Sequence, residues 1–253
     1  MTRVNRKTGF PMMFSKHGLA VTVFRSPYVW VFVMAVLFYT VTAPVNRSEA
    51  EDAYLYARLV EEGNGPALLH GHHMLHLPLA RALYIPLHAA FPALRSLPVL
   101  AGLSVAATSL MLCLSLRLFR FRLRLSLPDA SVAVLLLGSA WAVWRYAAEA
   151  EVYALSSLAT VGLLLCAIRP DGALGRPWLS GLVAALAIGM HIMNLPLALA
   201  LGLLMLWRRQ WRRAGRYAAA CGILLVLIYG AAWWAGWDPG RLLAPTPTGA
   251  GDA

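Results

Sequence analysis

Acidic residues and lysine are scarce in this sequence: 11 Asp and Glu stand against 22 Lys and Arg, and only Lys7 and Lys16 are lysine. A basic complement built on arginine, with abundant Ala and Leu, is typical of a bacterial gene with GC-rich coding. Cys113, Cys166 and Cys221 all lie inside apolar runs and form no close pair, which excludes a disulfide framework and a cysteine metal site. With so few acids, carboxylates at the end of an apolar run need a functional or structural reason.

Hydrophobic residues make up 60% of the chain, and the mean hydropathy is +0.64. Soluble domains contain roughly 45–50% apolar residues, and the apolar runs here approach the ~20 residues that cross a bilayer as a helix. The sequence therefore predicts an all-α, polytopic transmembrane helix bundle with about 7–8 membrane segments. The net charge of +11 does not indicate nucleic acid, because the basic residues cluster between apolar runs as cytoplasmic loops do. They favour membrane lipid with anionic headgroups instead.

The chain divides by composition into three parts. We expect residues 1–26 to be a basic cytoplasmic N-terminus, residues 27–237 to be the transmembrane module, and residues 238–253 to be a disordered tail. Residues 45–75 form the first outside loop. The protein is predicted to be a multi-pass protein of a bacterial inner membrane.

Two apolar runs are irregular. The run at 77–91 is short and contains Pro78, Arg81 and Pro86, so we expect a short or re-entrant helix that does not cross. All basic loops then share one face of the membrane. The run at 178–207 has no charged residue and a polar break at His191, which predicts two short helices. Residues 130–148 are predicted to form a span that leads to Glu149 and Glu151.

The face opposite the basic loops carries two acidic clusters. Glu49, Glu51 and Asp52 open a predicted interfacial helix that ends at Glu62, within which Glu61 and Glu62 are interpreted as solvated. The second cluster, Glu149 and Glu151, follows Arg145. Two carboxylates that face one cavity can divide the work, one accepting a proton and the other positioning a substrate, and arginine can hold a phosphate.

The stretch from Trp144-Arg145-Tyr146 to Glu149-Ala150-Glu151-Val152-Tyr153-Ala154-Leu155 resembles a motif of the C-superfamily of glycosyltransferases (GT-C), in the branch with transmembrane protein O-mannosyltransferases. Gly189-Met190-His191 and His76-Leu77-Pro78-Leu79 resemble further motifs of that branch. The resemblance implies inverting transfer of a sugar from a polyprenyl-phosphate donor to an acceptor hydroxyl. Family members have more spans, so a truncated chain would need a partner membrane subunit.

The resemblance also implies roles for single residues. Asp52 or Glu51 would be the general base, Glu151 would orient a substrate, and Arg145 and His191 would contact the donor phosphate. The remaining substrate-binding candidates are Glu49, Glu149, Tyr153, Asn194, His72, His73 and His76. A divalent cofactor, Mg or Mn, stays open, because some members need one and others do not.

Two other functions stay open. His72 and His76 are four residues apart and could share a helix face that binds Zn²⁺ or Cu²⁺. No carboxylate or cysteine lies at ligand spacing within this run, so no metal ligand is assigned. The other alternative is a non-catalytic membrane module that binds lipid or a partner chain.

Overall fold

A computed structural model describes residues 26–43, 51–63, 65–171 and 173–238 of the chain, and within these ranges it contains helices and no strand. The predicted cytoplasmic N-terminus, Glu49 and the predicted tail from residue 239 onward lie outside the described residues. The helices are α2 (Pro27–Val41), α3 (Glu51–Glu62), η1 (Gly65–Leu68), α4 (His76–Ala90), α5 (Ser96–Phe121), α6 (Leu127–Ser139), α7 (Trp141–Ala147), α8 (Tyr153–Ala167), α9 (Pro177–Met190), η2 (Ile192–Asn194), α10 (Leu195–Trp207) and α11 (Trp211–Trp234).

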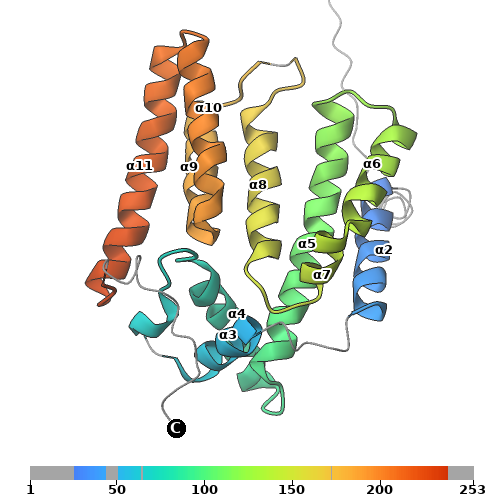
Figure 1. The fold of residues 1–253 in the computed structure, drawn as a ribbon, viewed down its shortest axis with the longest axis vertical. Helices are drawn as coiled ribbons and strands as arrows, with labels where there is room; N and C mark the ends of the chain where they lie inside the picture. Colours follow the sequence, from blue (N-terminus) through green and yellow to red (C-terminus); the bar gives the residue numbers. More distant parts are fainter. Residues whose placement is uncertain (1–25, 44–50, 64, 172, 239–253) are drawn as a thin grey trace, which may run out of the picture.

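Helices α2, α5, α8, α9, α10 and α11 run lengthwise through the bundle, whereas α3 and α4 lie together across one of its ends (Figure 1). We call this the pocket end. The α5–α6, α8–α9 and α10–α11 connections meet at the other end, which we call the arginine end (Figure 1). Helix α4 lies beside α3 at the pocket end, and the described basic connections lie together at the arginine end, so the predicted sharing of one membrane face by the basic loops agrees with this arrangement and stays a prediction.

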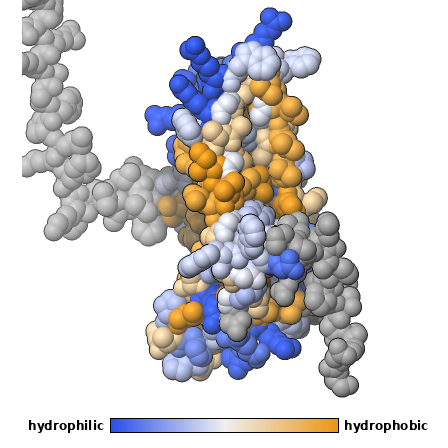
Figure 2. Space-filling view, turned by 90° about the vertical axis from the view of Figure 1, so that its left-hand side faces the viewer, coloured by the Kyte–Doolittle hydropathy of each residue, from blue (hydrophilic) through white to orange (hydrophobic). Residues whose placement is uncertain are grey.

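The lengthwise helices differ in whether they are long and apolar enough to cross a membrane. By length and composition, α5 and α11 qualify, and α6 with α7 qualify together as a pair bent by 65°. The described part of the chain therefore holds two or three candidate spans, accompanied by the shorter apolar helices α2, α8, α9 and α10. The predicted total of seven to eight membrane segments is not established by this count. Figure 2 shows a hydrophobic band between two more hydrophilic ends, as expected for a membrane-embedded bundle.

Local sequence explains where the helices begin and end. Pro27 and Pro177 occupy the first turns of α2 and α9, where a missing N–H costs nothing. The Ser126 hydroxyl accepts the Asp129 N–H at 3.3 Å and caps α6. The predicted break of the 178–207 run is confirmed: α9 ends at Met190, and α10 begins at Leu195.

The predicted span over residues 130–148 corresponds to α6 and α7, which the structure separates by a bend of 65° that the sequence did not predict. Ala140 adopts extended backbone, with φ −57° and ψ 132°, and separates α6 from α7. The Gly138 carbonyl, which a continuous helix would use for its own hydrogen bond, accepts the Tyr39 hydroxyl at 2.8 Å. A tertiary contact from α2 therefore replaces a helical bond at the point of the bend.

Small side chains let α9 and α11 pack closely. A Cβ atom added at Gly181 would lie 2.4 Å from the Tyr217 carbonyl oxygen and 2.9 Å from the Ala220 Cβ. Ala184 and Ala185 of α9 are fully buried in the same helix. Small residues that allow backbones to approach closely are the usual means of helix association in membranes, so this contact stabilises the half of the bundle that carries His191.

We predict that Gly181→Ala destabilises the protein by about 1–3 kcal/mol, because the added methyl group meets a backbone carbonyl that cannot rotate away. Gly222→Ala in α11 is the matched control, since a Cβ there meets nothing within 4 Å. The measurement is thermal unfolding in detergent. Equal stability of the two variants would contradict the close packing of α9 on α11.

Candidate functional site

A cavity of about 650 Å³ lies at the pocket end of the bundle. Its walls come from α3, the segment between η1 and α4, the α7–α8 connection, the α9–α10 break and the segment after α11. We name it the Asp52–Glu151 pocket. Its polar and aromatic lining residues are Asp52, Tyr56, His70, His72, His73, Glu151, Tyr153, His191 and Trp237.

Helix α3 presents one face to this pocket. Asp52, Leu55, Tyr56 and Leu59 have the i, i+3, i+4, i+7 spacing of a single helix face, and all four line the cavity. Asp52 is exposed in the first turn, where the helix dipole favours a negative charge. The buried Tyr56 has a raised pKa, first because of burial and then because the carboxylates of Asp52 and Glu151 lie near it.

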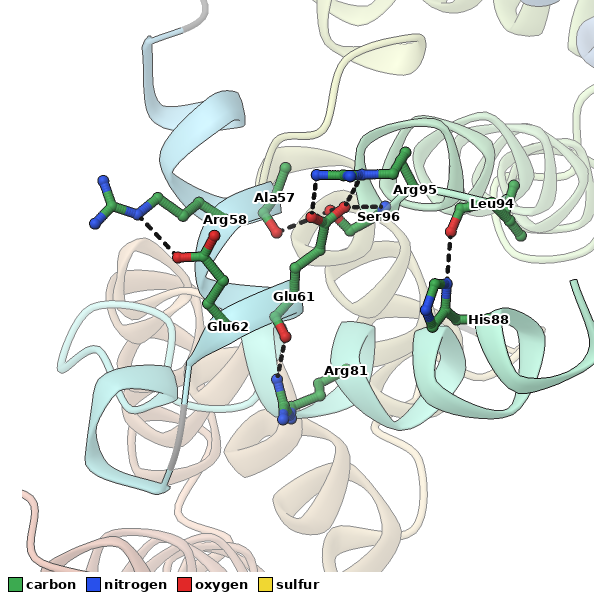
Figure 3. Close-up of polar contacts among 9 residues, drawn as sticks. All are labelled: Ala57, Arg58, Glu61, Glu62, Arg81, His88, Leu94, Arg95 and Ser96. Carbon is green, nitrogen blue, oxygen red and sulfur yellow. Dashed lines mark hydrogen bonds and ion pairs between the residues drawn. The ribbon is translucent and has the colours of Figure 1, made fainter. Parts of the chain in front are cut away.

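The opposite end of α3 is fixed by Glu61 (Figure 3). Its carboxylate accepts hydrogen bonds from Arg95 Nε and Nη2 at 3.1 and 2.7 Å, and from Ser96 N and Oγ at 2.8 and 3.0 Å. These bonds lower the pKa of Glu61, with the Ser96 backbone N–H as the largest cause. The Arg81 guanidinium donates to the Val60 carbonyl at 2.6 Å and joins α4 to the same point.

The interpretation of Glu61 and Glu62 as equally solvated is wrong for Glu61, which caps the N-terminus of α5. It holds for Glu62, whose only described ion pair joins it to Arg58 on the exposed surface. Adjacent acids thus have different roles: the Glu61 side chain joins α3 to the start of α5, and Glu62 faces solvent.

Glu151 lies in the connection between α7 and α8 and is only 7% exposed. The pKa of Glu151 is raised to about 7, mainly by burial and in addition by the negative charges of Asp52 and Glu149. The carboxyl group is therefore close to half protonated at neutral pH. A group in this state can either accept or donate a proton in the pocket.

Glu149 and Arg145 form a separate buried pair. Arg145 Nη2 lies 3.0 Å from Glu149 Oε1, and the two side chains are 12% and 3% exposed. Neither residue lines the pocket. Their pairing joins the last turn of α7 to the connection that carries Glu151. The pair therefore lies beside the pocket, where it can hold this connection in position.

The histidines of the pocket end pack on one another. The rings of His70 and His73 stack with centroids 4.2 Å apart, and His76 lies edge-on to His73. Burial is the main cause that lowers the pKa of His73 to about 2 and that of His76 to about 4. Burial also lowers the pKa of His70 and of His191. All four rings are therefore neutral at physiological pH.

Backbone hydrogen bonds fix the tautomers of two of these rings. His70 Nδ1 accepts the His72 N–H at 3.3 Å, and His191 Nδ1 accepts the Met193 N–H at 3.1 Å. A neutral imidazole that accepts at Nδ1 carries its proton on Nε2. His70 and His191 thus offer N–H donors from the pocket walls, while Asp52 and Glu151 supply oxygen acceptors.

The loop that carries the histidines is fastened to the α9–α10 break. Leu75 N donates to the Gly189 carbonyl at 2.9 Å, and Ile192 N donates to the His72 carbonyl at 2.7 Å. A Cβ added at Gly189 would lie 2.7 Å from Leu75 Cδ1. The glycine of the Gly189-Met190-His191 motif therefore permits the close approach that brings His191 beside His73, with ring centroids 6.2 Å apart.

The structure brings together some predicted site residues and not others. Asp52, His72, His73, Glu151, Tyr153 and His191 line one pocket, and His76 is buried beside it. Asn194 instead bonds Thr160, Ser156 and the Ala187 carbonyl, outside the pocket lining. Glu51 lies in the first turn of α3, and its side chain, like the whole of Glu49, is outside the described part of the structure.

Among the polar and aromatic lining residues, Tyr56, His70 and Trp237 were not predicted as site residues. Tyr56 could have been found from its helical spacing after Asp52. Trp237 could not, because it reaches the pocket only by the packing of α11, where the Tyr229 hydroxyl donates to the Gly71 carbonyl at 3.1 Å. The Trp237 indole nitrogen is buried without a hydrogen-bond partner in the described structure, which leaves a further donor in the wall.

The described side chains do not fit a metal centre. Within the described ranges, no group of three or more His, Cys, Asp or Glu side chains has the geometry to hold a metal ion. The rings of His73 and His76 pack against Tyr56 and edge-on against each other, with ring centroids 5.2, 6.0 and 6.3 Å apart. The predicted alternative of a histidine-cluster metal protein therefore has no support in the described geometry.

We predict that Glu61→Ala reduces the activity of this pocket and lowers stability by about 1–2 kcal/mol, because a helix cap and a charge-assisted hydrogen bond are lost. Glu62→Ala should change neither, since its ion pair is exposed. Thermal unfolding and a substrate-binding assay on both variants check this. Similar behaviour of the two variants would contradict the anchoring role of Glu61.

We also predict that Asp52→Asn lowers the pKa of Glu151 toward its ordinary value, because a negative charge that disfavours ionisation is removed. Infrared titration of the protonated carboxyl band, assigned by its loss in Glu151→Gln, measures this. Glu62→Gln is the control of equal charge change and should leave the titration unchanged. An unshifted band in Asp52→Asn would show that the two carboxylates do not share a cavity.

The sequence profile of glycosyltransferase family 87 matches residues 75–241, about two thirds of the chain. The matched region runs from the start of α4 through α11 and contains Glu151, Tyr153 and His191, whereas α3 and Asp52 precede it. No curated protein and no solved structure shows a significant match. A membrane-embedded helical bundle with two carboxylates in one pocket is consistent with a transferase of this kind. The chain belongs to glycosyltransferase family 87.

Proposed function

We propose that this glycosyltransferase transfers a sugar from a polyprenyl-phosphate donor to an acceptor hydroxyl in the Asp52–Glu151 pocket. The observation that carries the proposal is that two carboxylates from distant parts of the chain line one cavity together with several histidines. The positive-inside rule assigns the arginine end to the cytoplasm and the pocket end to the outer face of a bacterial inner membrane. Donor lipids with a translocated headgroup would present their sugar at that face.

The proposed reaction is a single displacement with inversion. Asp52 accepts the proton of the acceptor hydroxyl as its oxygen forms a bond to the anomeric carbon. The bond from that carbon to the phosphate oxygen breaks, and the polyprenyl phosphate leaves with the electron pair. The exposed position of Asp52 at the first turn of α3 supports this role, because an acceptor can reach it from solvent. Glu51, its neighbour, is the alternative base.

Glu151 has a different role in this proposal. With a pKa of about 7, its carboxyl group can accept from or donate to a sugar hydroxyl, and we assign it to orient the donor or acceptor sugar. The donor phosphate is assigned to the Nε2–H groups of His70 and His191. Arg145 is already paired with Glu149, so its proposed role is to hold the Glu151 connection rather than to contact phosphate.

We propose a second cavity as the binding site for the lipid part of the donor. A cavity of about 250 Å³ between α5, α7 and α8 is lined mainly by apolar side chains such as Met111, Val143 and Ala147. Tyr153 lines both this cavity and the Asp52–Glu151 pocket. We assign the first isoprene units to this cavity, so that the sugar phosphate passes Tyr153 into the pocket. The resemblance to O-mannosyltransferases makes mannose the first sugar to test.

We expect Asp52→Asn to lower the rate of transfer from radiolabelled polyprenyl-phosphate mannose by about 10²-fold or more, the usual contribution of a general base. Glu151→Gln should lower the rate and remove an ionisation near pH 7 from the rate profile. The assay uses the purified protein in detergent with membrane extracts as the acceptor source.

Two further variants sharpen this experiment. Glu51→Gln tests the alternative base, and Glu62→Gln, which removes an exposed charge from the same helix, should transfer at the wild-type rate. Wild-type rates in Asp52→Asn, Glu51→Gln and Glu151→Gln together would contradict the site assignment. Donor binding without transfer by the wild-type protein would favour the non-catalytic lipid-binding alternative.

A further inference from the structure

A second cavity, of about 750 Å³, lies at the arginine end of the bundle. It is bounded by the C-terminal ends of α5 and α8 and the N-terminal ends of α9 and α11. We call it the arginine pocket. Its charged lining consists of Arg122, Arg169, Arg176, Arg213 and Arg216, and no acidic residue is among its described lining residues.

Two of these arginines are held in place by backbone carbonyls. Arg122 Nη2 donates to the Leu165 carbonyl at 3.2 Å, and Arg213 Nη2 donates to the carbonyls of Leu174 and Gly175. The Nε atoms of both arginines are buried without a hydrogen-bond partner in the described structure. A buried donor without a partner is unfavourable, so these two guanidinium groups are held in place but lack part of their hydrogen bonding.

The other arginines extend the positive surface outward. Arg176 and Arg216 are exposed, and their side chains make no hydrogen bond or ion pair with other described residues. Arg169 pairs with Asp171 at 3.3 Å, with both side chains more than half exposed. One exposed acid therefore faces five positive charges around one cavity, and a bound anion would relieve their mutual repulsion.

The chemistry of the walls selects the kind of anion. Guanidinium groups bind phosphate oxygens through paired N–H donors. The rest of the lining includes apolar side chains of Leu165, Pro177 and Leu179, which suit the glycerol and upper acyl region of a lipid. Exposed tryptophans Trp178 and Trp207 lie at the same end, at the level where tryptophan marks a membrane–water interface.

We propose that the arginine pocket binds the phosphate group of an acidic phospholipid from the leaflet opposite the Asp52–Glu151 pocket. The phosphate accepts from Arg176 and Arg216 at the mouth and from Arg122 and Arg213 inside. Because the pocket lies between α5 and α8 on one side and α9 and α11 on the other, the bound lipid joins the two halves of the bundle. The inference does not depend on the transferase reaction.

The test is native mass spectrometry of the detergent-solubilised protein titrated with dioleoylphosphatidylglycerol or dioleoylphosphatidylcholine. The wild type should retain phosphatidylglycerol in preference to phosphatidylcholine. Arg176→Gln/Arg216→Gln should weaken phosphatidylglycerol binding about tenfold or more, since each arginine near anionic lipid contributes roughly 1 kcal/mol. Neither arginine has a described intramolecular partner, so the double variant removes no internal contact.

Matched variants separate the pocket from general surface charge. Arg208→Gln/Arg212→Gln makes the same charge change at the same end outside the pocket and should weaken binding by much less. Arg176→Lys/Arg216→Lys should recover part of the affinity. Equal losses in the two glutamine variants would overturn the proposal in favour of diffuse attraction. Displacement of the lipid by inorganic phosphate alone would also overturn it, by assigning the pocket to free phosphate.

Discussion

The hydrogen bonds between the Glu61 carboxylate and the start of α5 determine how α3 is placed at the pocket end. One carboxylate accepts from the Ser96 N–H, the Ser96 hydroxyl and the Arg95 guanidinium, and it fixes the C-terminal end of α3 against the start of α5. Asp52 lies nine residues earlier, about 13 Å along the helix axis. With one end of α3 fixed, the direction of the helix carries Asp52 across the end of the bundle toward Glu151. The interaction that places the exposed acid is therefore made far from the cavity itself.

The pocket combines polar groups with little net charge. His70, His73 and His191 are neutral because burial makes their charged forms costly, and burial is also the main cause that raises the pKa of Glu151 to about 7. What remains is an array of oriented donors and acceptors around one exposed carboxylate. Such an array suits a substrate with many hydroxyl groups, because each hydroxyl can both donate and accept, and it requires little reorganisation when a charge moves between acceptor and phosphate.

The sequence predicted the parts of the fold that depend on local chemistry. Polar and proline residues at 191–196 predicted the break between α9 and α10. The interrupted apolar run after His76 predicted a helix that lies at one end of the bundle. The sidedness of the basic loops predicted that Asp52 and Glu151 share one face, and the family resemblance added the prediction that they act in one site. The bend at Ala140, the cap made by Glu61 and the arrival of Trp237 could not be predicted, since each depends on a tertiary partner more than 30 residues away or on helix packing. The family match confirms a glycosyltransferase, and the O-mannosyltransferase branch stays a prediction.

Tyr153 lines both cavities, and for the proposed reaction this bears on the order in which the lipid donor and the polar acceptor bind. The lipid would arrive laterally from the bilayer, past the aromatic ring, whereas a water-soluble molecule would arrive over the first turn of α3. Because the two proposed entry paths are separate, neither reactant blocks the path of the other. In the proposed reaction, the lipid donor and the polar acceptor would therefore bind in random order, and neither would have to bind first.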